Sequence, residues 1–85
     1  MNLSKTEQRV LHALAQGAVS LHKREGRRVI AVTCVDRDGA ILSDCDLAVF
    51  ERLRRRRLIR SEGGAPYRIA RAGRLDVRSQ PDDRA

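Results

Sequence analysis

Aromatic residues are nearly absent from this 85-residue chain, which contains one phenylalanine, one tyrosine and no tryptophan. Phe50 and Tyr67 cannot fill a core alone, so leucine, isoleucine, valine and alanine must supply most of the buried surface. A chain of this length buries only about 60–65% of the surface that its unfolded form exposes. The sequence therefore predicts one small domain with a modest aliphatic core, and it argues against a deep substrate cavity.

Cysteines and long apolar runs are also scarce. The chain has two cysteines, Cys34 and Cys45, whereas a small secreted domain usually carries more. No apolar run approaches the ~20 residues that a membrane span needs, and no leader peptide is visible. These features predict a cytoplasmic protein with reduced thiols and no membrane contact. The spacing of His12 and His22 from the cysteines matches no compact zinc motif, so we expect no metal and no cofactor.

Acidic residues are few in the second half of the chain. The formal net charge is +7, and from Phe50 to Arg78 ten arginines stand against three acidic residues. Such an imbalance favours an acidic partner, which can be nucleic acid, an acidic protein face or an anionic membrane, although neither predicted helix is apolar enough on one face to anchor in a membrane. Lysine, a common companion of arginine in phosphate binding, is absent after Lys23. Arginine enrichment without lysine also suits the centre of a protein–protein interface.

The segment LSKTEQRVLHALAQG predicts the first helix. Ser4 and Glu7 have the spacing of a capping box, in which each residue bonds to the backbone of the other. Apolar residues then recur at helical spacing, and Gly17 is suited to end the helix in a left-handed conformation. From Ala18 to Leu42, alternating and β-branched residues predict a three-stranded antiparallel meander made of AVSLHK, RRVIAVTCV and AIL. The intervening KREGRR and DRDG segments predict the turns.

SDCDLAVFERLRRRR predicts the second helix, with Ser43 or Asp44 as N-cap and an end at Arg56 or Arg57. LIRS and PYRI, joined by EGGA, predict a β-hairpin, and ARAGRLDVRSQ predicts a short final helix. A helix followed by a glycine-joined hairpin is the second half of a winged helix, although strands replace the usual preceding helix. We therefore predict a winged-helix-like α+β domain over residues 1–78 and a flexible polar tail over residues 79–85.

When the segment FERLRRRRLIR is placed on a helix, its arginines fall on different faces. With Phe50 at the centre of the buried face, Arg52 and Arg55 point to solvent, and Arg54 lies at the margin, where it can pair with Glu51. Because Arg52 and Arg55 are expected to be exposed, reversing their charge should change stability by less than about 1 kcal/mol. The alternative interpretation is a solvated basic face that complements the helix dipole. The predicted partner- or DNA-binding residues are Arg52, Arg55, Arg56, Arg60, Arg68, Arg71 and Arg74.

No constellation of residues predicts an enzyme. Cys45 lies near the start of a predicted helix, where the pKa of a thiol can fall, but Asp44 and Asp46 beside it oppose that effect. No general base lies near it in sequence, and there is no glycine-rich phosphate loop or serine nucleophile elbow. The sequence predicts a protein that acts by binding.

Stretches in matching order along nearly the whole chain resemble the YjhX-like family of small bacterial proteins. They are MNLSKTEQRVLHALAQG, SDCDLAVFERL, LIRSEGGAPYRI and GRLDVRSQ. The resemblance implies a type II toxin that binds and inhibits DNA topoisomerase I by protein contact and is neutralised by an acetyltransferase-like antitoxin. It implies no particular site residues. The residues alone leave a second hypothesis open, a winged-helix-like protein or regulator that binds duplex DNA through its basic helix and wing.

Overall fold

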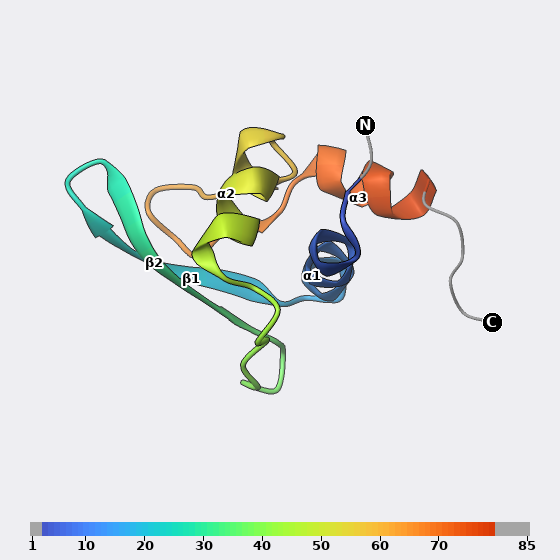
Figure 1. Cartoon of the computed structure of the whole chain (residues 1–85), viewed down its shortest axis with the longest axis horizontal. Helices are drawn as coiled ribbons and strands as arrows, with labels where there is room; N and C mark the ends of the chain where they lie inside the picture. Colours follow the sequence, from blue (N-terminus) through green and yellow to red (C-terminus); the bar gives the residue numbers. More distant parts are fainter. Residues whose placement is uncertain (1–2, 80–85) are drawn as a thin grey trace.

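Residues 3–79, the part of the chain that the computed structural model describes, form three helices and two antiparallel hairpins (Figure 1). The α+β class is therefore confirmed, while the likeness to a winged helix stays a prediction. In chain order the elements are α1 (Lys5–Ala15), β1 (Val19–Glu25), β2 (Arg28–Val35), α2 (Leu47–Arg55), β3 (Ile59–Arg60), β4 (Arg68–Ile69) and α3 (Arg71–Ser79).

The capping box predicted for α1 is confirmed. The Ser4 backbone N–H donates to Glu7 Oε1 at 2.8 Å, and the Glu7 backbone N–H donates to Ser4 Oγ at 3.1 Å. Gly17 follows the helix with φ 112°, a left-handed conformation that glycine adopts without strain. The apolar side of α1 that faces the core comprises Val10, Leu11 and Leu14.

The first hairpin is longer than predicted. The prediction of a third strand in the meander is wrong. β1 and β2 continue through the expected turn to Glu25 and Arg28, which pair with each other. The AIL segment makes only one bridge, from Ile41 to Val35. Asp36 Oδ1 accepts the backbone N–H groups of Asp38 and Ala40, in the turn that follows β2, each at 2.9 Å. The chain then turns away to begin α2, so no further pairs form.

One bridge joins the two hairpins. Ser20 of β1 and Tyr67, just before β4, exchange both backbone hydrogen bonds, each at 2.9 Å. The strands therefore lie in the order β2, β1, β4, β3, with each pair antiparallel. The helices pack on one side of this surface, as Figure 1 shows for α2 above the β1–β2 ribbon. Phe50 of α2 is fully buried there, and its ring meets Tyr67 edge-on at 4.8 Å.

The prediction of reduced thiols is wrong, because Cys34 and Cys45 form a disulfide with their Cα atoms 6.0 Å apart. Cys34 lies on the inward side of β2 and Cys45 lies just before α2, which packs against that side. Both cysteines are buried, and the Ser20 hydroxyl lies 3.0 Å from Cys34 Sγ. The two cysteines lie eleven positions apart in sequence, and the return of the chain from the turn onto the sheet brings them together.

The start predicted for α2 is also wrong, whereas its end is confirmed. Asp46, rather than Ser43 or Asp44, is the N-cap, and its Oδ1 accepts the Val49 N–H at 2.9 Å. The residues before it form a turn that includes the disulfide-bonded Cys45, so the helix cannot begin earlier. At the other end the helix stops at Arg56, its C-cap, as predicted.

The short final helix is confirmed as α3, which packs against α1. Of the tail predicted for residues 79–85, Ser79 ends this helix, and residues 80–85 lie outside the described part of the chain. Within residues 3–79, none of the helices is both long enough and apolar enough to cross a membrane.

Candidate protein-binding surface

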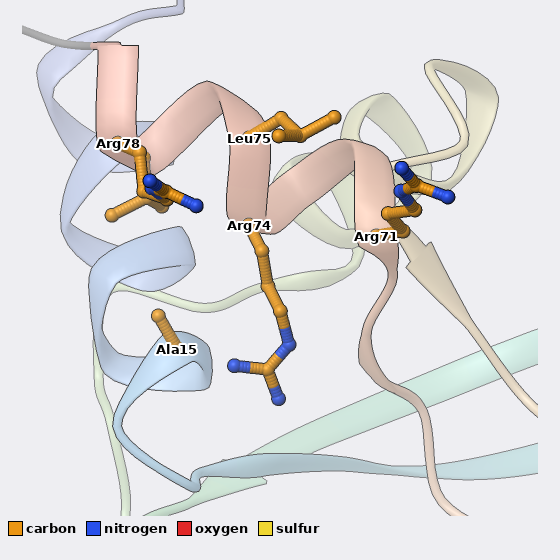
Figure 2. A pocket seen from close by; sticks show the side chains of 6 residues that line it. Ala15, Arg71, Arg74, Leu75 and Arg78 are labelled. Atoms are coloured by element: carbon orange, nitrogen blue, oxygen red, sulfur yellow. The ribbon is translucent and has the colours of Figure 1, made fainter.

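Three arginines of α3 line an open hollow of about 470 Å³ against the end of α1. Arg71, Arg74 and Arg78 stand at i, i+3 and i+7, a spacing that places them along one face of the helix. In Figure 2 the Arg74 side chain extends from the middle of α3 down past the end of α1, where Ala15 is labelled, and Arg71 and Arg78 project from the two ends of α3. All three arginines are exposed. α3 thus presents a basic, concave surface.

In the part of the chain that the structure describes, no ion pair balances the positive charge of this hollow. Within the described residues, the ion pairs involve other arginines, and none joins Arg71, Arg74 or Arg78 to an acidic residue. Three like charges within about two helical turns repel one another, and only Arg78, in the last turn, complements the helix dipole. Their summed field attracts an acidic partner to this part of the surface. Arg71 and Arg74 were predicted as binding residues, and the structure brings them together with Arg78, which the prediction omitted.

A second basic group lies on the short hairpin. Arg60 of β3 and Arg68 of β4 are direct cross-strand partners, and both side chains are exposed. Arg60 pairs with Glu62 at 2.8 Å, whereas Arg68 meets no carboxylate among residues 3–79. Like charges opposite each other destabilise a strand pair. This pair therefore resembles the α3 arginines in presenting charge that the fold does not require.

The arginines of α2 divide into structural and exposed members. The Arg54 side chain pairs with Glu51 at 2.7 Å, which confirms the predicted pair, and it also lies over the Phe50 ring. Arg52 is exposed as predicted, but its Nε donates to Glu7 Oε2 of α1 at 3.0 Å. Arg55 is exposed at the end of the helix. The run of arginines is therefore not one binding patch.

Arg56 is half-buried and its backbone caps α2. Of the seven predicted binding residues, Arg56 and Arg52 thus have roles in the fold itself.

Glu7 carries a structural role that sequence reasoning found only in part. Burial raises the pKa of its carboxyl, but hydrogen bonds from the Ser4 backbone and side chain and the nearby Arg52 guanidinium outweigh it, so the net pKa is lowered. The capping box was visible in the sequence. The Arg52 contact joins residues 45 positions apart, and no local pattern indicates it. Reversing the charge of Arg52 would place two carboxylates together, so the small stability change predicted above for Arg52 no longer holds.

Arg57 follows the C-cap of α2 with φ 61°, a left-handed conformation that favours glycine. Because the Arg57 side chain is exposed, we expect Arg57→Gly to stabilise the fold by about 0.5–1 kcal/mol. Arg55→Gly, which removes the same charge from inside the helix, should instead destabilise it by about 1 kcal/mol. Urea unfolding of both variants measures this difference. A less stable Arg57→Gly variant would contradict the assigned backbone conformation.

Comparison with known proteins places this chain in a family. The sequence profile of the YjhX toxin family, described as "Putative toxin of bacterial toxin-antitoxin pair", matches residues 1–84. A UPF0386 protein of Rhodospirillum rubrum is 61% identical over 98% of this chain and 93% of its own length. UPF0386 proteins of Rhodospirillum centenum and Brucella anthropi are 54% and 52% identical, and the alignments cover 100% and 99% of this chain and 100% of each relative. No solved structure gives a significant match. The chain therefore belongs to the YjhX toxin family of bacterial toxin–antitoxin pairs.

Proposed function

We propose that this chain is a toxin that binds DNA topoisomerase I in the bacterial cytoplasm and inhibits it by protein contact, without chemistry of its own. The antitoxin of the pair, which the resemblance gives as an acetyltransferase-like protein, neutralises it. The observation that carries the proposal is the hollow of α3, where three arginines have no carboxylate partner among the described residues. The summed positive field of this hollow attracts an acidic region of a partner protein.

Two further observations support contact rather than catalysis. Arginine is favoured at protein interfaces because its planar guanidinium binds carboxylates in pairs of hydrogen bonds. The hollow is open and its walls include the apolar side chains of Ala15, Leu75 and Val77. Apolar walls together with guanidinium groups are suited to bind a protein surface that carries both apolar and acidic side chains.

The proposal is tested by relaxation of supercoiled plasmid by purified topoisomerase I in the presence of increasing amounts of this chain. We expect inhibition by the wild type. The double variant Arg71→Ala and Arg74→Ala should need about tenfold more protein for the same effect, since interface arginines commonly contribute more than 1 kcal/mol each. The matched control removes two exposed arginines, Arg27 and Arg28, from the tip of the first hairpin. Unchanged relaxation at a large excess of the wild-type chain would contradict the proposal.

A second candidate function, binding to duplex DNA, is favoured by one observation. Arg60 and Arg68 lie side by side on the short hairpin that stands in the place of a wing. Phosphate contacts would make log K fall with log salt by about 0.9 for each phosphate neutralised. Duplex binding measured between low and moderate salt checks this, and a flat slope, or no binding at ~100 mM salt, counts against it.

A further inference from the structure

The side of the sheet that faces away from the helices carries an uncovered apolar row. Inward-facing positions of β1 and β2 include the buried Ser20 and Cys34, which are cross-strand partners. Because side chains alternate along a strand, the neighbouring partners Val19 and Val35 face the other way. Leu21, two residues on from Val19, shares their side and is 43% exposed. The outward side of the hairpin thus carries the exposed Leu21 and the half-buried Val19 and Val35, with the exposed Thr33 opposite Leu21.

This row continues from the first hairpin to Ile41 on one flank and to the short hairpin of β3 and β4 on the other. Ile41 bridges to Val35, so it lies on the same side, and it is 70% exposed. On the other flank the bridge between Ser20 and Tyr67 places Arg68 beside Val19, one residue along. Arg68 in turn is opposite Arg60. One outward row therefore runs from apolar side chains to two arginines, and we call it the open sheet face: Ile41, Val35, Val19, Leu21, Arg68 and Arg60.

No helix among residues 3–79 covers the open sheet face. In Figure 1, α2 and the chain leading to β4 lie above the β1–β2 ribbon, and α1 and α3 lie beyond its end. The buried residues of the short hairpin, Ile59 and Ile69, face that same inward side. Exposed Ile41 and Leu21 cost free energy in water, at about 25 cal/mol for each Å² of apolar surface, which covering them would recover. Exposed apolar side chains gathered on one side and bordered by charge are typical of a protein interaction surface.

We propose that the open sheet face binds the neutralising partner of the toxin–antitoxin pair, through a partner surface whose apolar centre is bordered by carboxylates. The apolar side chains fit the centre of such a surface, and Arg68, which has no acidic neighbour in the described chain, meets the carboxylates. The face as a whole is less suited to duplex DNA, since only Arg60 and Arg68 at its edge can meet phosphates, and its valine, leucine and isoleucine side chains offer nothing to them. A second copy of the chain is disfavoured because both copies carry a net charge of +7. The inference rests on membership of the pair and is independent of the topoisomerase proposal.

The test is the affinity of the purified antitoxin partner for the full-length chain, measured by calorimetry. The face variant combines Arg68→Glu with Leu21→Ser and is expected to bind at least about tenfold more weakly, because it reverses one rim charge and removes one apolar contact. The matched control combines Arg27→Glu with Ile30→Ser, the same kinds of change at exposed positions near the tip of the first hairpin. It should bind as the wild type does. Circular dichroism of both variants verifies that they fold, and Ile41→Ser provides a second, milder face variant.

Each other outcome overturns the inference. Wild-type affinity in the face variants, an equal loss in the control, or no binding of the partner to the wild type all contradict it. Sedimentation that shows a dimer of the free chain, dissociated by the face variant, would assign the face to a second copy. Loss of duplex binding with the partner affinity unchanged would assign it to DNA. If the chain does not inhibit relaxation of plasmid by topoisomerase I, the topoisomerase proposal fails. The affinities of the antitoxin partner still decide the proposal for the open sheet face.

Discussion

Gly73→Ala is expected to destabilise the fold by about 3 kcal/mol, although glycine to alanine inside a helix ordinarily stabilises it by about 1 kcal/mol. A Cβ added at Gly73 would lie 2.3 Å from the Leu58 carbonyl oxygen and 2.7 Å from Ile69 Cγ1. That carbonyl cannot easily move, because it accepts the Ala70 N–H at 2.8 Å and so holds the start of α3 to the end of α2. The added methyl group would push α3 away from the core.

Urea unfolding measures this effect, with Ala72→Gly as the neighbouring control. Ala72 is exposed on the same helix, so its replacement should cost only about 1 kcal/mol through helix propensity. An alanine variant at position 73 as stable as the wild type would show that α3 does not pack so closely against Leu58. The arrangement of the arginine hollow would then have to be revised, since α3 carries all three of its arginines.

Glu7→Ala is expected to lower the free energy of unfolding by about 2–3 kcal/mol, through loss of the capping box and of the hydrogen bond to Arg52. The Glu7 side chain is almost fully buried, while Arg52 is about half exposed, at 49%. The solvent around Arg52 weakens the charge attraction, so we expect less than the effect of a fully buried pair. Glu62→Gln, which removes an exposed carboxylate from its pair with Arg60, is the control and should change stability little.

The same carboxyl predicts how stability depends on pH. Because the pKa of Glu7 is lower in the folded chain than its ordinary value of 4.5, its stabilisation is complete above that value. It is lost as the pH falls from 4.5 through the lowered folded pKa. Urea midpoints of the wild type at pH 7, 5, 4 and 3 should therefore fall more steeply in acid than those of Glu7→Gln. Parallel curves for the two proteins would contradict the lowered pKa.

Local patterns predicted much of the fold. The capping box of Ser4 and Glu7, the left-handed Gly17 and the stop of α2 at Arg56 all depend on neighbouring residues, and all are confirmed. The predictions that were wrong concern the segment after β2, where the outcome depends on how the chain folds back and not on any pattern of adjacent residues. The Cys34–Cys45 disulfide and the single bridge at Ile41 follow from how the turn after β2 folds back onto the sheet.

The candidate site shows the same division. The sequence indicated that arginines in the second half of the chain exceed what helix capping needs, and it placed Arg54 beside Glu51 correctly. It could not show that Arg52 is held by Glu7 of another helix, nor that Arg78 joins Arg71 and Arg74 around one hollow. The sequence also could not indicate the open sheet face, because the face depends on the bridge between the two hairpins. Charge can be counted from sequence, whereas grouping the charges requires the tertiary fold.

The most direct test of the central claim is binding of this chain to purified topoisomerase I with no DNA present, measured by calorimetry or sedimentation. Contact between the two proteins through the α3 hollow predicts a complex in the absence of DNA, and it predicts about tenfold weaker binding by the Arg71→Ala and Arg74→Ala double variant. A complex that forms only when DNA is added, or equal affinity of the wild type and the double variant, would contradict the claim.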